Sequence, residues 1–266
     1  MTRILAGDLD THVQRLPPTI PVDGDAPVVV FIHGLLTDSL ASYYFTLGPA
    51  FAAAGVDVVM YDLRGHGKSD RPATGYQLER FVSDLVSLLD AMDITRPVHL
   101  VGNSFGGSIA FGLAAAHPDR VATVIAIEAE PPVQAWTVRM AEGLDLAKSQ
   151  LTQDAVIDWI AVNNGRHTAR LSRAAGRLLQ VTSMLEDIPV SDTIADDLSA
   201  IRCPVLAIFG ADSGLSRQVP YFESYLTSCR TVVLPDQGHS VLIERTDETR
   251  DVILGWVRDH ALGRVG

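Results

Sequence analysis

Short, continuous apolar runs recur along the chain, separated by mixed polar segments. A run without polar residues is typical of a strand buried on both faces, because neither side of such a strand meets water. Such runs predict strands at residues 26–32, 56–61, 97–101, 121–127, 204–209 and 231–234. A weaker run at 11–16, closed by Pro17-Pro18, predicts an early edge strand.

Between these runs, apolar residues recur with a helical period. In the segment 77–92 they lie three to four residues apart, which favours a helix with one buried face. Helices are also predicted at 39–54, 104–116 and 247–260. Strands that alternate with helices predict an α/β fold with a mostly parallel central sheet flanked by helices. Ligands of such sheets bind at the carboxyl ends of the strands.

One polar motif lies between a predicted strand and the helix that follows it. Gly102-Asn103-Ser104-Phe105-Gly106 fits the pattern Gly-x-Ser-x-Gly, which places a serine on a sharp strand-to-helix turn. The glycines let strand and helix approach closely. The first N–H groups of the helix lie beside the serine oxygen, where negative charge develops during acyl transfer. The motif therefore indicates Ser104 as a nucleophile.

Composition narrows the classes of partner and location. The chain has 266 residues and a net charge of −11, which argues against nucleic acid and anionic membranes as partners. It has no 18-residue apolar run, and its first ten residues lack a signal-peptide core. Its two cysteines, Cys203 and Cys229, have no metal-ligand spacing. These features predict a cytoplasmic protein.

Five segments together resemble the α/β-hydrolase family. They are His33-Gly34, the segment 62–70, the motif around Ser104, Phe209-Gly210-Ala211-Asp212 and Gln237-Gly238-His239. They occur in the family's order and cover about residues 26–131 and 201–262. The resemblance implies an α/β-hydrolase fold with a core domain of residues 1–132 and 201–266. It also implies a helical lid (cap), residues 133–200, inserted after the sixth strand.

A serine hydroxyl is a weak nucleophile until a base takes its proton, and histidine has a suitable pKa for this role. Of eight histidines, His239 lies in a glycine-containing loop after the last predicted strand, where the family has its base. His33 and His66 occupy family positions that serve loop structure. We therefore predict His239 as the general base.

The acid that orients His239 has more than one candidate. The commonest family position lies three residues after Gly210, and here it is occupied by Ser213. Asp212 is one residue short, and a slip of one residue in extended chain reverses the direction of a side chain. A second placement, found in polyketide and non-ribosomal peptide thioesterases and in zearalenone-type lactonases, follows strand 121–127. Glu128 and Glu130 follow that strand. We predict Glu128, with Asp212 as the alternative and Glu130 third.

The remaining site residues follow from the resemblance and from the lid. The resemblance implies an oxyanion hole made by the backbone N–H groups of Leu35 and Phe105. Leu36, Trp136 and Trp159 are predicted to contact substrate, and the leucine- and tryptophan-rich lid favours a moderately large, apolar substrate.

Four arginines in the predicted lid have helical spacing: Arg166, Arg170, Arg173 and Arg177. A helix would place them on one face. One interpretation is attraction for an acidic carrier protein or a phosphopantetheine phosphate. The other is a solvated face opposite the leucines of the same helix.

The sequence thus predicts a serine hydrolase that cleaves an ester, lactone or thioester through an acyl-enzyme. A thioesterase or lactonase role in secondary, polyketide-type metabolism is a narrower form of this prediction. No metal or organic cofactor is implied. The alternatives are a carbon–carbon bond hydrolase with the same triad and a slow-turnover ligand-binding protein.

Overall fold

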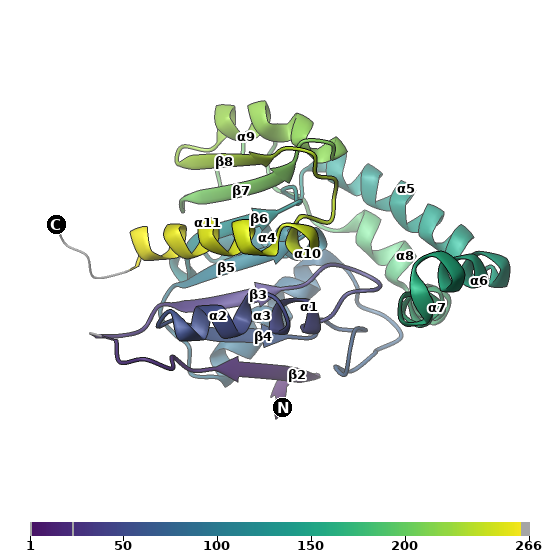
Figure 1. Cartoon of the computed structure of the whole chain (residues 1–266), viewed down its shortest axis with the longest axis horizontal. Helices are drawn as coiled ribbons and strands as arrows, with labels where there is room; N and C mark the ends of the chain where they lie inside the picture. Colours follow the sequence, from purple (N-terminus) through teal and green to yellow (C-terminus); the bar gives the residue numbers. More distant parts are fainter. Residues whose placement is uncertain (1, 23, 262–266) are drawn as a thin grey trace.

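The computed structural model describes residues 2–22 and 24–261. Its strands are β1 (Thr2–Ala6), β2 (Leu9–Leu16), β3 (Val28–Ile32), β4 (Asp57–Tyr61), β5 (Val98–Asn103), β6 (Val121–Ile127), β7 (Val205–Gly210) and β8 (Cys229–Leu234). They form one sheet in the order β1-β2-β4-β3-β5-β6-β7-β8 (Figure 1). The pairs β1·β2 and β2·β4 are antiparallel, and the other pairs are parallel.

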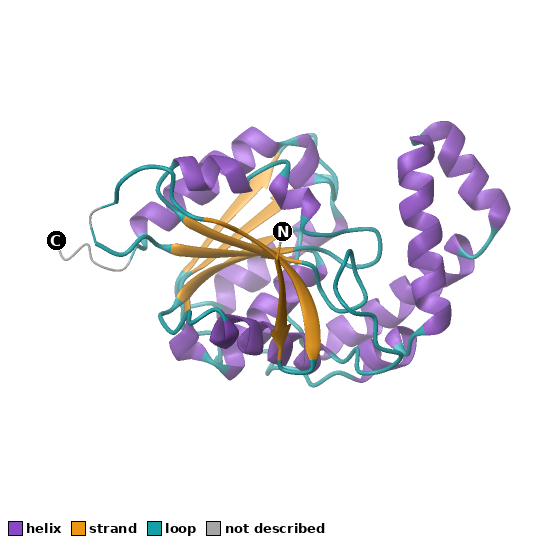
Figure 2. Ribbon diagram, turned by 90° about the horizontal axis from the view of Figure 1, so that it is seen from below, coloured by secondary structure: helices purple, strands orange, loops and turns teal. Residues whose placement is uncertain are grey.

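Helices cover both faces of this sheet (Figure 2). They are α1 (Ala41–Tyr44), α2 (Gly48–Ala53), α3 (Leu78–Ala91), α4 (Phe105–Ala116), α9 (Val219–Tyr225), α10 (Val241–Glu244) and α11 (Thr246–Asp259). One apolar core includes residues of α3, α4 and α9, and the other includes residues of α1, α2, α10 and α11. Successive side chains of β3 enter opposite cores, Val30 the first and Phe31 the second. This arrangement confirms the predicted α/β fold.

Two predicted elements differ from the structure. The predicted early edge strand corresponds to β2, which is not at the edge of the sheet because β1 pairs along its outer side. β1 itself was not predicted, since most of its residues are exposed and it has no buried apolar run. The predicted helix 39–54 is two short helices, α1 and α2. Pro49 lies in the first turn of α2, where its missing N–H costs nothing but prevents the upstream helix from continuing.

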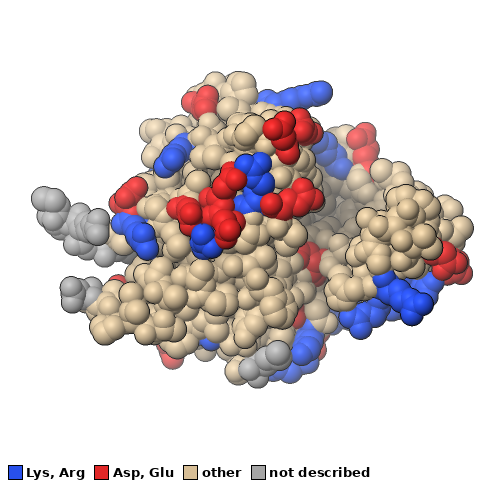
Figure 3. All heavy atoms as spheres, viewed as in Figure 1, with Lys and Arg blue, Asp and Glu red and all other residues tan. Residues whose placement is uncertain are grey.

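Four further α-helices lie between β6 and β7: α5 (Gln134–Leu151), α6 (Asp154–Asn163), α7 (Gly165–Val181) and α8 (Met184–Asp187). α6 and α7 form a hairpin that projects from the core (Figures 1 and 2). The space-filling view shows a hollow between this hairpin and the core (Figure 3). Helices therefore follow the sixth strand as predicted, while the division into a core domain and a cap at residues 133 and 200 stays a prediction. Residues 1, 23 and 262–266 of that predicted core lie outside the described residues.

Across residues 2–22 and 24–261, none of the helices combines the length and the apolar character needed to cross a membrane.

Candidate active site

Ser104 lies at the junction of β5 and α4, in a backbone conformation that few side chains adopt. Its φ is 52° and its ψ is −121°. The turn is so tight that a Cβ on Gly102 would lie 2.3 Å from the carbonyl oxygen of Gly106. A Cβ on Gly106 would lie 2.1 Å from the carbonyl oxygen of Ile32 in β3. The two glycines of the motif are therefore required by close backbone approach, and the strained turn is typical of a functional site.

Glu128 and His239 are brought together from the ends of β6 and β8. Glu128 Oε2 lies 2.8 Å from His239 Nδ1. The carboxylate is fully buried, whereas 57% of the imidazole side chain is exposed. Gly210 N–H donates to Glu128 Oε1 and Ser213 Oγ donates to Oε2, each at 2.5 Å. Burying a carboxyl group is costly without hydrogen-bond donors, and this loop cluster supplies two of them beside the histidine.

The other two acid candidates lie apart from His239. Asp212 is exposed, and its backbone N–H donates to the carbonyl of Gln237 at 2.9 Å. Its carboxylate makes no hydrogen bond or ion pair within the described part of the chain. Glu130 is buried and is held by Arg139 Nε at 2.9 Å, by Arg139 Nη2 and by Gln218. Of the three candidates, Glu128 alone contacts the imidazole.

Ser104 and His239 are not joined by a hydrogen bond in this structure. Because Glu128 takes Nδ1, the remaining nitrogen of His239, Nε2, is left for a hydroxyl group. Ser104 is half-buried, and its backbone N–H donates to the carbonyl of Ile127, the residue before Glu128, at 2.9 Å. The nucleophile and acid candidates are thus fixed at neighbouring strand ends. Bonds between a nucleophile and its base are often long without substrate and tighten when substrate binds.

The backbone N–H groups of Leu35 and Phe105 have no acceptor among the described residues. The N–H groups on either side of Leu35 are occupied: Gly34 donates to Asp38 Oδ2 at 2.7 Å, and Leu36 donates to His66 Nε2 at 2.9 Å. Leu36 has a φ of 67°, which turns the chain at this point. The geometry leaves the two predicted oxyanion-hole donors available.

His66 is a neutral hydrogen-bonding bridge in this loop. Its Nε2 accepts from Leu36, so Nδ1 carries the proton and donates to the carbonyl of Arg64 at 2.8 Å. Burial, reinforced by the neighbouring His33, lowers the pKa of His66 to about 3. His33 Nε2 accepts from the N–H of Leu63 at 3.0 Å. Both histidines hold the loops beside the site.

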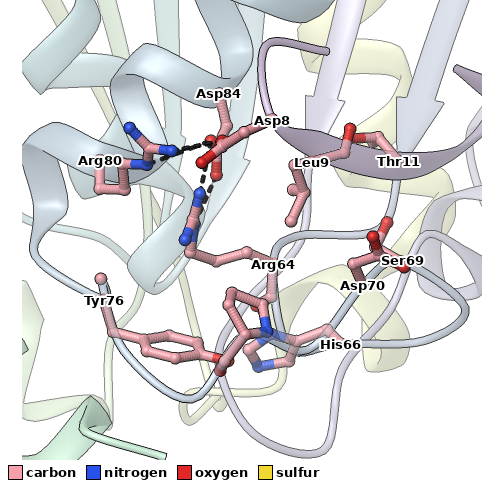
Figure 4. A network of polar contacts seen from close by, with 12 residues as sticks. Asp8, Leu9, Thr11, Arg64, His66, Ser69, Asp70, Tyr76, Arg80 and Asp84 are labelled. Carbon is pink, nitrogen blue, oxygen red and sulfur yellow. Dashed lines mark hydrogen bonds and ion pairs between the residues drawn. The ribbon is translucent and has the colours of Figure 1, made fainter. Parts of the chain in front are cut away.

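The loop that carries His66 is anchored to α3 by a buried ion pair. Arg64 Nε and Nη2 donate to the two carboxylate oxygens of Asp84 at 2.6 and 2.7 Å, and both side chains are almost fully buried. Figure 4 shows Arg64 reaching Asp84 from one side and Arg80 from the other. A two-point pair of this kind fixes orientation as well as distance.

The predicted substrate residues lie in different surroundings. Trp136 is 1% exposed, and its ring stacks on that of Phe105 with centroids 6.1 Å apart. Trp159 is 62% exposed on α6, and Leu36 is half-buried. Contact of these three residues with substrate stays a prediction.

The four arginines predicted to lie on one face of a helix do share one side of α7. They line a hollow of about 250 Å³ with residues of α6, and basic side chains gather along the hairpin in Figure 3. Arg173 lies 3.5 Å from Asp154, whereas the other three have no carboxylate within 4.0 Å among the described residues. An acidic carrier protein as the partner stays a prediction.

The sequence reasoning named Ser213 only as a non-acid and missed its contact with Glu128. Its position in the sequence could have indicated this contact, because a hydroxyl at the family's usual acid position points in the direction in which the carboxylate of an acid would point.

Residues 27–174 match the model of the alpha/beta hydrolase fold family. The chain is 30% identical over 194 residues to the non-heme chloroperoxidase of Streptomyces lividans, a match that covers 65% of this chain and 69% of that protein. It is 36% identical over 143 residues to epoxide hydrolase A of Mycobacterium tuberculosis, covering 50% of this chain and 44% of the relative.

Solved structures share the fold at lower identity. The enol-lactonase from Burkholderia xenovorans LB400 superposes with a TM-score of 0.73 at 22% identity, covering 97% of this chain and 100% of that one. An esterase from Exiguobacterium antarcticum gives a TM-score of 0.77 at 20% identity, covering 97% and 99%.

Proposed function

This chain belongs to the α/β hydrolase fold family, and on that basis we propose that it is a serine hydrolase whose nucleophile, base and acid are Ser104, His239 and Glu128. The buried Glu128 carboxylate, 2.8 Å from Nδ1 of an exposed imidazole, carries this proposal. A structural ion pair has no need to keep one partner at the surface. A base that must exchange protons with substrate does.

The proposed reaction has two steps. Ser104 Oγ attacks the substrate carbonyl while His239 Nε2 takes its proton, and Glu128 stabilises the imidazolium through Nδ1. The N–H groups of Leu35 and Phe105 donate to the oxygen as it gains charge. His239 then gives the proton to the leaving alcohol or thiol. Water then attacks the acyl-enzyme while His239 takes one of its protons. His239 returns this proton to Ser104 Oγ as the bond to the acyl group breaks and the acid is released.

The proposed substrate is an ester, lactone or thioester with a moderately large, apolar acyl part. The exposed imidazole of His239 supports an accessible site. Structural neighbours that are described as an enol-lactonase and an esterase support hydrolysis at a carboxylic ester carbon. A thioesterase or lactonase role in secondary metabolism is the narrower form of this proposal, and it rests on an acid that follows β6.

A cytoplasmic location is part of the proposal. Its support is that Cys203 and Cys229 are free thiols in the structure. Burial raises the pKa of each thiol to about 11, so neither is an activated nucleophile that competes with Ser104.

The test is turnover of p-nitrophenyl esters of increasing acyl length, an aliphatic lactone and an acyl thioester, by wild type and Ser104→Ala. We expect the kcat of Ser104→Ala to be lower than that of wild type by about a thousandfold or more. Mass spectrometry should show the added mass of one acyl group on wild type and none on Ser104→Ala. Equal turnover by both proteins would refute the serine mechanism. Turnover of a vinylogous diketone without any acyl-enzyme would assign carbon–carbon bond hydrolysis instead.

A further inference from the structure

Glu128 is held by neutral donors rather than by a cation. Among the described residues no arginine or lysine lies within 4.0 Å of it, and His239 is its sole ionisable partner. Its Oε1 accepts from Gly210 N–H and its Oε2 from Ser213 Oγ, both at 2.5 Å. Hydrogen bonds to a charged group are the strong ones, so each donor contributes substantially to holding this carboxylate.

The hydroxyl of Ser213 has a fixed direction. Ser213 caps the short helical turn 214–218, and its Oγ accepts from Leu215 N–H at 3.2 Å. A carboxylate accepts only, so the single hydroxyl proton of Ser213 must be donated to Glu128. The residue is 8% exposed, which leaves little room for water to replace its hydroxyl.

The same carboxylate oxygen serves Ser213 and His239. Oε2 accepts from Ser213 Oγ and from His239 Nδ1, at 2.5 and 2.8 Å. A glutamate side chain has three rotatable bonds, and Gly210 N–H fixes only the other oxygen. The hydroxyl therefore decides where the oxygen that faces the imidazole lies.

We propose that Ser213 is a positioning residue that holds the Glu128 carboxylate against His239. Ser213 occupies the position after β7 where the family commonly has its acid, and from there its hydroxyl supports Glu128, which follows β6. Ser213 touches neither substrate nor reacting atoms and acts through Glu128. This inference rests on the proposed function for its effect on turnover, but the contact itself is independent of any reaction.

The test compares Ser213→Thr with Ser213→Val, two side chains of the same shape that differ in the hydroxyl. With a p-nitrophenyl ester as substrate, we expect Ser213→Thr to keep kcat within about threefold of wild type. Ser213→Val should lose about 10- to 100-fold in kcat, the effect of one hydrogen bond to a charged group, with little change in KM. Ser216→Ala is the matched control, because its hydroxyl bonds to the Ser213 and Ala211 carbonyls in the same turn and does not touch Glu128.

A double-mutant cycle separates positioning from a simple capping role. In the Glu128→Gln background, Ser213→Val should lower kcat by less than about twofold further, because the carboxylate that Ser213 positions is no longer present. A loss of the same size in both backgrounds would show that the hydroxyl only caps the turn, and would overturn the proposal.

A measurement without substrate distinguishes this proposal from the proposed function. The Nδ1 proton of His239, assigned in ¹⁵N-histidine-labelled protein with His239→Asn, should shift in Ser213→Val and stay in Ser213→Thr and Ser216→Ala. An unchanged resonance in Ser213→Val refutes the positioning role. A shifted resonance together with full activity of Ser104→Ala refutes the serine mechanism and leaves the positioning role standing.

Discussion

Glu128 Oε2 lies 2.8 Å from His239 Nδ1, although the two residues are 111 positions apart in the chain. The exposed Asp212, one residue before the usual acid position, makes no such contact. We therefore predict that Glu128→Gln lowers kcat by about three to four orders of magnitude, since the imidazolium loses its counter-charge. Asp212→Asn should stay within about twofold of wild type. Steady-state kinetics on one p-nitrophenyl ester measures both, and the reverse ranking would assign the acid to Asp212.

A second prediction concerns the loop that presents the Leu35 N–H. His66 occupies the neighbouring N–H of Leu36 and ties it to the carbonyl of Arg64. Removing this bridge in His66→Ala frees the left-handed turn at Leu36. We expect a loss of about 100-fold in kcat, similar to the loss of one oxyanion donor.

His117→Ala is the control for that experiment, because His117 is an exposed histidine at the end of α4. Its kcat should equal that of wild type. Equal kcat in the two variants would show that the loop holds its shape without His66.

A third prediction is a stability that falls with acidification. Burial, with a smaller effect of His260, lowers the pKa of His99 to about 4, and burial and His33 lower that of His66 to about 3. Both histidines are neutral in the folded and unfolded chain above pH 6.5. Below it only the unfolded chain takes up their protons, so their contribution to stability is full above pH 6.5. It falls steadily below pH 6.5 and is fully lost once the pH is below the folded pKa, about 4 for His99 and about 3 for His66.

Each histidine should add about 1.4 kcal/mol per pH unit to the slope of the unfolding free energy between pH 6 and 4. Urea unfolding at several pH values measures this slope. His66→Gln and His99→Gln should each flatten it relative to wild type. A slope that none of the variants alters would contradict the neutral, buried state of the two histidines.

A fourth prediction compares two glycine substitutions. A Cβ on Gly106 would lie 2.1 Å from a backbone oxygen, whereas a Cβ on Gly143 in α5 would meet nothing within 4 Å. We expect Gly106→Ala to lower the free energy of unfolding by about 3 kcal/mol or more, because backbone cannot move aside cheaply. Gly143→Ala should raise it by about 0.5–1 kcal/mol through better helix propensity. Urea denaturation measures both, and destabilisation of equal size in the two would contradict the close approach at Gly106.

The strands that the sequence predicted best are those whose apolar run is bounded by polar residues on both sides. β6 was predicted with its observed bounds, Val121–Ile127, for this reason. β1 was missed because strand pairing, rather than burial, forms it, and pairing leaves no apolar pattern. The predicted helix 39–54 ran through the break between α1 and α2, because the helical period of apolar residues continues there. The break is set by a single proline, Pro49, in the first turn of α2.

The sequence favoured Glu128 over Asp212 and Glu130 as the acid, but it did not contain the contact between Glu128 and His239. This contact depends on a turn with a φ of 48° at Glu128 and on the bond from Glu128 N–H to the carbonyl of Ile208 in β7. It also depends on which way residues 212 and 213 face after β7. All three are set by pairing between strands that are distant in sequence, which a local pattern does not contain.

The short path from Glu128 to α5 limits how the helices after β6 can be exchanged. Two residues after Glu128, Glu130 is buried and depends on Arg139 of α5 for its counter-charge. A graft of a foreign helical segment that begins at residue 133 removes this arginine and leaves the buried Glu130 without its ion-pair partner, two residues from Glu128. A graft that begins after Arg139 keeps it. An exchange of the helices between β6 and β7 should therefore begin inside α5, after Arg139, and not at the start of that helix.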